Sequence, residues 1–271
     1  MLRTYLRKSI ALGLGVIEME GHFFTDRGQV RIHNEDSGGI LAGANGQYLA
    51  IIADGMGGHQ AGDVASMMAT NAFEKKWNEN EGFDSPEAVE KWLKQTLLEA
   101  NKLIYQHSVE NEECQGMGTT IVVAICTEEF ITVAHIGDSR CYLYNNFSFK
   151  QLTEDHTLVN ALVQTGQISK DDALVHPRKN VVLKALGTGE IVEPDIQTIS
   201  WEDGDKLLLC SDGLTDKVLD DELAEYMKSA TNIKEIGQSL VDLANERGGE
   251  DNVSLVILQH ETNVEEGESS C

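Results

Sequence analysis

The sequence predicts an α+β fold in one domain. Strand-like and helical segments come in blocks: two helices precede several adjacent strands, and two later helices precede a last strand. Because this order does not alternate as a βαβ series does, it favours separate helical and sheet layers over a doubly wound sheet. The 271 residues, 41% of them hydrophobic, are enough for a large core, and no repeat or Pro- or Ser-rich linker divides the chain.

The individual elements follow from hydrophobic periodicity and end signals. Small and apolar residues recur at helical spacing over 61–77. Ser85 and Pro86 start a second helix, running to about residue 109, because serine caps a helix and proline fits its first position. The other expected elements are strands over 30–36, 47–53, 119–126, 130–136 and 140–144, a helical stretch after 155, a strand before 212, helices over 220–230 and 233–246, and a strand over 253–258.

Apolar, strand-like runs carry an aspartate at their edge in four places: Asp54, Asp138, Asp212 and Asp251. A carboxylate at a strand end is partly dehydrated, which is costly unless a cation or a hydrogen-bond donor meets it. Any one of them alone is better explained as a turn residue. Together with the acidic pair Glu35 and Asp36, the four favour converging oxygen ligands, which suit magnesium or manganese rather than zinc or copper.

Composition restricts the partners and the compartment. The net charge of −24 argues against nucleic acid or an anionic membrane as a partner, because attraction would be reversed. Five scattered cysteines without a C-x-x-C pair predict reduced thiols and a cytoplasmic protein. The apolar stretch 10–17 after three basic residues superficially resembles a signal peptide. It is short and is followed at once by Glu18 and Glu20, so we reject that interpretation.

The glycine-rich stretch 55–62 matches neither the dinucleotide-binding nor the P-loop pattern, and no serine-hydrolase, zinc-protease or kinase motif is present. Six other motifs occur in the order seen in the metal-dependent protein serine/threonine phosphatases, the PPM or protein phosphatase 2C family: Arg31–Asp36, Ala53–Gly58, Gly116–Thr120, Gly137–Arg140, Ser211–Leu214 and Glu250–Asn252. From about residue 21 to 259 the chain resembles the bacterial branch of this family.

The resemblance implies a four-layer α/β/β/α sandwich of two antiparallel sheets flanked by helices, with the metal site between the sheets. It divides the chain into an N-terminal extension over 1–20, a phosphatase domain over 21–260 and an acidic, disordered tail over 261–271. A flap over about 155–186 would lie beside the metal site. Its basic residues Arg178 and Lys179 are candidates to meet a phosphopeptide.

The resemblance also implies ligands for two Mn²⁺ or Mg²⁺ ions. Asp54 would bridge both ions, Asp212 and Asp251 would complete the first, and Glu35 with the Gly55 carbonyl would serve the second. The bridging water, present as hydroxide near neutral pH, would then attack phosphorus directly, without a covalent enzyme intermediate.

Three further residues receive roles from the same resemblance. Asp36 would orient a metal-bound water, and Arg31 would bind phosphate oxygens through its planar guanidinium. Asp138 with Asp212 would hold a third ion, and the alternative for Asp138 is a structural turn in contact with Arg140.

The proton donor for the leaving group stays open. Animal relatives have a histidine two residues after the bridging aspartate, where this chain has Met56. A metal-bound water, His59 or His156 could serve, although a structural role explains each histidine at least as well.

The implied function is dephosphorylation of phosphoserine and phosphothreonine proteins by a monomer that opposes a bacterial serine/threonine kinase. The alternatives are a small-molecule phosphate monoesterase and an inactive metal-binding scaffold or sensor.

Overall fold

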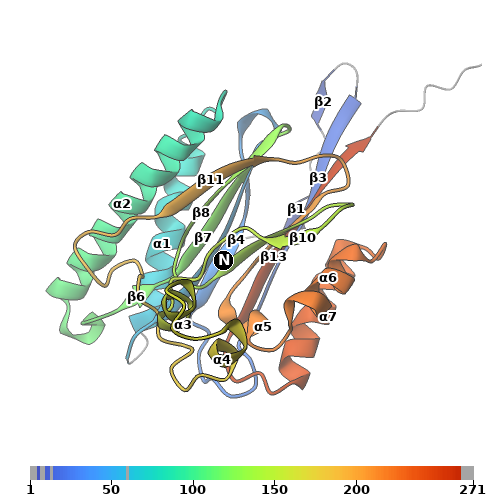
Figure 1. The fold of residues 1–271 in the computed structure, drawn as a ribbon. Coiled ribbons are helices and arrows are strands. Elements are labelled where there is room, and N and C mark those ends of the chain that lie inside the picture. The colour runs from blue at the N-terminus through green and yellow to red at the C-terminus, as the bar shows by residue number, and fades with distance from the viewer. Residues whose placement is uncertain (1–4, 7–9, 13–14, 59–60, 264–271) are drawn as a thin grey trace, which may run out of the picture.

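The computed structural model describes residues 5–6, 10–12, 15–58 and 61–263. These residues form four layers: helices, a six-stranded sheet, a seven-stranded sheet and a second set of helices (Figure 1). Every pair of neighbouring strands among them is antiparallel. The expected α+β class and the α/β/β/α sandwich are both confirmed.

The first helical layer contains α1 (Ala61–Asn78) and α2 (Pro86–Glu110). The second helix starts as predicted, because the N–H of Ala88 donates to Ser85 Oγ at 3.3 Å. Both helices cover the six-stranded sheet, which has the order β11 (Asp195–Ser200), β8 (Phe130–Ile136), β7 (Ile121–Cys126), β5 (Tyr48–Met56) and β4 (Asp36–Ala42), with β6 (Gly118–Thr119) paired to β5.

The second helical layer covers the other sheet and consists of α5 (Asp212–Thr215), α6 (Asp220–Lys228) and α7 (Ile233–Glu246). That sheet has the order β1 (Tyr5–Leu6), β3 (Gly15–Asp26), β13 (Val253–Asn263), β12 (Lys206–Cys210), β9 (Arg140–Tyr144) and β10 (Phe149–Gln151), with β2 (Ile10–Leu12) paired to β3. Two short 3-10 helices lie in connections, at Ala44–Gly46 and Glu112–Cys114.

Three apolar cores lie between the layers. Successive side chains of a strand point to opposite faces of its sheet, so one apolar strand contributes to two cores. Ile51 faces the α1–α2 side, whereas its neighbour Ile52 faces the opposite sheet. In the same way Leu207 packs between the sheets and Leu208 packs against the outer helices. The central strands are therefore buried on both faces, which is why they appear in the sequence as continuous apolar runs.

Residues 155–186, the flap, contain two short helices, α3 (Leu158–Gln164) and α4 (Lys170–Leu174). They lie near α5 at one end of the sandwich (Figure 1). Ser169 and Asp172 form a capping box that fixes the start of α4. The helical stretch expected after residue 155 is therefore two helices rather than one.

The expected strand over 30–36 is wrong. Residues 27–35 form an irregular loop, and β4 begins only at Asp36. The apolar side chains that indicated a strand are 63% exposed at Val30 and 79% exposed at Ile32, so they pack in no core. The hydrophobic periodicity also did not predict β11, because this edge strand is half exposed and its apolar and polar residues alternate only weakly.

The two ends of the chain bear on the expected domain limits. Strand β3 runs across the proposed boundary between residues 20 and 21 and pairs with β13 from Val16 opposite Asn263 to Asp26 opposite Val253. The expected tail begins at Glu261, within β13, and its residues 264–271 lie outside the described part of the chain. The domain limits stay predictions. Among the described residues, no helix is long and apolar enough to cross a membrane.

Candidate active site

The acidic residues singled out from the sequence come together where the two sheets end. Asp36, the first residue of β4, lies opposite Asp54 near the end of β5. Asp138 follows β8, Asp212 opens α5 directly after β12, and Asp251 precedes β13. Antiparallel pairing places the start of one strand beside the end of its neighbour, so these positions share one end of the sandwich.

A hydrogen bond joins the two sheets at this end. Ser211 Oγ, at the end of the seven-stranded sheet, donates to Asp36 Oδ2 of the six-stranded sheet at 2.9 Å. The carboxyl groups of Asp54 and Asp212 also share a hydrogen bond, although they come from different sheets. The acidic residues therefore form one cluster rather than separate turns.

Burial and mutual repulsion raise the pKa of four aspartates of this cluster, Asp36, Asp54, Asp138 and Asp212. Burial, opposed by hydrogen bonds from Ser254 and Ser211, raises the pKa of Asp36 to about 7. Burial and neighbouring carboxylates likewise raise the pKa of Asp138 to about 7 and that of Asp212 to about 6. The pKa of Asp54 is raised well above its usual value, because burial adds to the charges of the surrounding aspartates.

The cluster fits a hard divalent cation. Asp36 Oδ1 is buried and has no hydrogen-bond partner among the described residues, which is costly unless a cation or a donor meets it. The donor set consists of carboxylate oxygens, which magnesium and manganese prefer. A cation there would offset the repulsion that raises the pKa values.

Glu35 reaches the cluster through close backbone packing. Its carbonyl accepts hydrogen bonds from the Gly55 N–H at 3.2 Å and from Ser66 Oγ at 2.6 Å. Its carboxylate, whose pKa burial raises, lies against the first turn of α1, where a Cβ on Gly62 would come within 2.4 Å of Glu35 Oε2. The family motif in this part of the sequence ends at Gly58, so it does not include Gly62.

Asn252 holds the irregular loop that replaces the expected strand. Its Oδ1 accepts the Glu35 N–H at 2.8 Å, and its Nδ2 donates to the carbonyls of Arg27 at 2.8 Å and His33 at 3.0 Å. Asn252 itself is buried. The sequence placed it in a motif without assigning a role, and the structure identifies it as the residue that positions Glu35.

Arg31 lies in the same loop and extends over the cluster. Its Nη2 donates to Asp251 Oδ2 at 2.7 Å, and this hydrogen bond raises the pKa of the guanidinium. The side chain is half exposed. The residue expected to bind phosphate is thus paired with a residue expected to bind metal.

Asp138 is buried, and within the described part of the chain Arg140 donates to Asp155 and Tyr142 rather than to Asp138. Arg140 instead forms a bidentate pair with Asp155, at 2.9 Å from Nε to Oδ1 and 2.7 Å from Nη2 to Oδ2. Its Nη1 donates to Tyr142 at 3.0 Å. Arg140 therefore fixes the beginning of the flap.

His156 has both ring nitrogens engaged away from the cluster. Its Nδ1 accepts the Gly137 N–H at 3.1 Å, so Nε2 carries the proton toward Asp195 Oδ2 at 3.2 Å. The ring stacks on His135, and these two histidines with Asp195 are close enough for one cation. Because Nδ1 accepts a backbone hydrogen bond, we interpret the group as structural. His59 lies outside the described residues.

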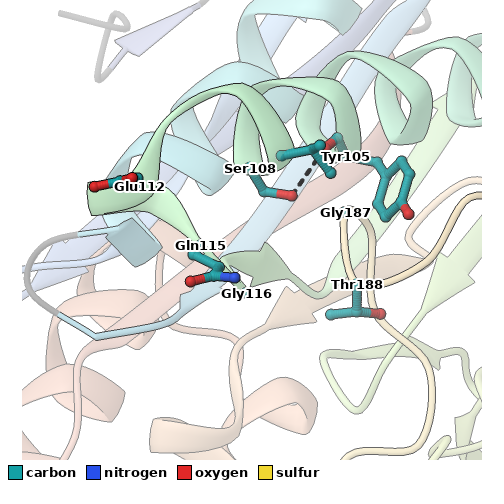
Figure 2. Close-up of a pocket in the computed structure, with 8 residues that line it drawn as sticks. Tyr105, Ser108, Glu112, Gln115, Gly116, Gly187 and Thr188 are labelled. Atoms are coloured by element: carbon teal, nitrogen blue, oxygen red, sulfur yellow. Dashed lines mark hydrogen bonds between the residues drawn. The ribbon is translucent and has the colours of Figure 1, made fainter.

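Two surface pockets bear on where a substrate could bind. One, of about 720 Å³, includes Asp138 and Asp212 and continues between the flap and α6. The other, of about 680 Å³, lies between the end of α2 and the loop at Gly187 and Thr188 (Figure 2). None of the expected site residues lines the second pocket, whereas Asp138 and Asp212 line the first.

Fold and site together define a four-layer α+β protein with an oxygen-donor cation site at the end of its sheets. Comparison with known families agrees: the model of the family described as protein phosphatase 2C matches residues 26–248. The chain belongs to this family.

Relatives and solved structures extend the comparison. The chain is 45% identical over 243 residues to serine/threonine phosphatase stp of Listeria monocytogenes, covering 90% of this chain and 96% of that protein. The crystal structure of serine/threonine phosphatase Stp1 from Staphylococcus aureus is 38% identical, with a TM-score of 0.84, 93% of this chain covered and 98% of the other. A catalytic domain of the phosphatase PstP in complex with two manganese ions is 34% identical, with a TM-score of 0.79 and coverage of 90% and 99%.

Proposed function

We propose that this protein is a metal-dependent protein serine/threonine phosphatase. The observation that carries the proposal is the cluster of carboxylates at the end of the two sheets, formed by Asp36, Asp54, Asp138, Asp212 and Asp251, in which the buried Asp36 Oδ1 has no hydrogen-bond partner among the described residues. Membership of the protein phosphatase 2C family and the names of its bacterial relatives support this activity. A neighbouring structure that contains two manganese ions supports the cofactor.

We assign two Mn²⁺ or Mg²⁺ ions to the cluster, with a third at Asp138. Asp54 would contact both ions, with Asp212 and Asp251 on one side and Glu35 and the Gly55 carbonyl on the other. When bound, the ions would polarise the phosphoryl group and lower the pKa of a water molecule.

The chain's own residues would then bind and orient the reactants. Arg31, released from Asp251, would bind phosphate oxygens through its planar fork, and Asp36 would accept a proton from the attacking water. His156 is a poor proton donor for the leaving group, because its nitrogens are bonded to Gly137 and Asp195.

Phosphoproteins are the expected substrates. A cognate serine/threonine kinase, a monomeric state and a cytoplasmic location stay predictions from the sequence. An inactive scaffold is disfavoured, because such a member would be expected to have lost Asp54, Asp212 or Asp251, and all three are present.

The test compares phosphoserine, phosphothreonine and phosphotyrosine peptides with free nucleotides, each with manganese, magnesium or a chelator. We expect metal-dependent release of phosphate from the phosphoserine and phosphothreonine peptides. Asp54→Ala should abolish it while the circular dichroism spectrum is unchanged. Turnover in the chelator would overturn the proposal, and a preference for nucleotides would favour a small-molecule phosphatase.

A further inference from the structure

A groove leads away from the acidic cluster. It starts at Asp138 and Asp212 and passes between the flap helices α3 and α4 on one side and the start of α6 on the other, enclosing about 720 Å³. We call it the flap groove. Because it is continuous with the cluster, a chain whose phosphorylated residue sits at the cluster would extend into it.

The basic side chains of the flap groove are largely neutralised. Arg140 is paired with Asp155 at 2.7 Å, and Lys179 is paired with Asp216 at 2.8 Å. Lys170 is the remaining basic residue of the lining. Lys179 was expected to offer a positive charge to a phosphopeptide. In the structure that charge is already paired with the carboxylate of Asp216.

Acidic side chains remain along the same groove. Glu154 and Asp221 are exposed and line it. Asp220 beside them is paired, because it lies 3.8 Å from Arg140 Nη1 and accepts a hydrogen bond from the Tyr142 hydroxyl at 2.9 Å. With the paired residues set aside, the groove beyond the cluster is net negative. Such a surface attracts a positively charged side chain and repels an acidic one.

Two exposed leucines face the groove from opposite walls. Leu174, at the end of α4, is 66% exposed, and Leu219, just before α6, is 62% exposed. Val159 and Val163 of α3 also line the groove, and Val159 is largely buried. Removing large, exposed apolar side chains from water is favourable, whether they cover one another or a bound apolar group.

We propose that the flap groove binds the substrate segment next to the phosphorylated residue and selects a segment with a basic and an apolar side chain. The inference rests on the proposed phosphatase function and adds the substrate class. Phosphate would be held by the cations and Arg31, so the groove's negative charge would act on the flanking residues rather than on the phosphate.

The test uses phosphothreonine peptides of equal length whose flanking residues are lysine and leucine, glutamate and leucine, or lysine and serine. Wild-type protein should show a kcat/KM about fivefold higher for lysine than for glutamate, because each exposed charge contact contributes modestly, and the preference should shrink with added salt. Glu154→Lys with Asp221→Lys should reverse this order. Leu174→Ser with Leu219→Ser should remove the advantage of leucine over serine.

The control charge reversal is Asp171→Lys, on the same short helix as Leu174 but outside the groove lining. It should leave the peptide preference unchanged. Hydrolysis of p-nitrophenyl phosphate, which is too small to reach the groove, should be equal in all variants.

Equal kcat/KM for lysine and glutamate peptides, or an unchanged preference in the double charge reversal, would overturn the inference while the phosphatase proposal stands. Failure of wild-type protein to hydrolyse p-nitrophenyl phosphate and the peptides with manganese would overturn both.

Discussion

The guanidinium of Arg31 donates to the carboxylate of Asp251 at 2.7 Å, joining residues 220 positions apart. One was expected to bind phosphate and the other to bind metal. Because both side chains are substantially exposed, the pair contributes only about 0–1 kcal/mol to the stability of the fold. Asp251 can therefore exchange Arg31 for a cation, and Arg31 can exchange Asp251 for a phosphate.

Replacing Arg31 should therefore separate metal binding from substrate binding. In Arg31→Ala the competing positive charge at Asp251 is lost, so we expect tighter Mn²⁺ binding by calorimetry. We also expect kcat/KM for a phosphopeptide to fall by about tenfold or more, because a charged phosphate contact is lost. Arg31→Lys keeps the charge without the planar fork and should lie between. Unchanged peptide kinetics in Arg31→Ala would contradict the phosphate-binding role.

Neutralising the bridging position should stabilise the metal-free protein while removing its activity. Asp54 is buried among carboxylates that raise its pKa, so Asp54→Asn removes a repulsive charge at nearly constant volume. We expect a gain of about 1–2 kcal/mol in the unfolding free energy in chelator. Activity should fall more than about a hundredfold. A loss of stability in urea unfolding would show that the carboxylates do not oppose one another.

Divalent cations should stabilise the folded state through the same cluster. A ligand that binds only the native state at a concentration 100 times its Kd adds about 2.7 kcal/mol. Thermal unfolding with increasing Mn²⁺ should show a rising midpoint in wild-type protein and a much smaller rise in Asp54→Asn. Equal shifts in the two proteins would place the cation elsewhere.

The loop that carries Glu35 should depend on Asn252. Asn252→Ala leaves the Glu35 N–H and two carbonyls without their partner, so we expect a loss of about 2–4 kcal/mol in urea unfolding. Mn²⁺ affinity should fall as well, because Glu35 is no longer positioned. Asn232→Ala, which removes the cap of α7, is the matched control and should cost only about 1 kcal/mol with Mn²⁺ affinity unchanged.

Stability in mild acid should depend on His135. Burial, opposed by a hydrogen bond to the Glu154 carbonyl, lowers the pKa of His135. As pH falls below about 6.5, the unfolded chain takes up a proton at this position before the folded protein does, so the contribution of His135 to the unfolding free energy declines. His135→Gln should remove this contribution, so that the difference in unfolding free energy between the variant and the wild type changes between pH 6.5 and 5. Parallel pH profiles for wild type and His135→Gln would contradict the prediction.

Helix caps and hydrophobic periodicity predicted much of the secondary structure. The cap at Ser85 and the apolar runs ending at Asp54 and Asp212 were predicted correctly, because caps and strand periodicity depend on neighbouring residues. The strand over 30–36 failed, because Val30 and Ile32 look like strand residues but have no core to enter. The sequence does not show that the side chain of Asn252 forms hydrogen bonds with the backbone of this loop, because the two are far apart in the chain.

The sequence by itself determined the α+β class, the family and the identity of the acidic residues, since these follow from periodicity, block order and six ordered motifs. Only the tertiary structure decided which of them meet: Arg31 with Asp251, Glu35 with Asn252, and Lys179 with Asp216. The physical reason is that these contacts join different layers or distant loops, and their distances are fixed by how two sheets and their helices pack. The charge of the flap groove depends on those pairings as well, because the carboxylate of Asp216 offsets the positive charge that Lys179 would offer to a phosphopeptide.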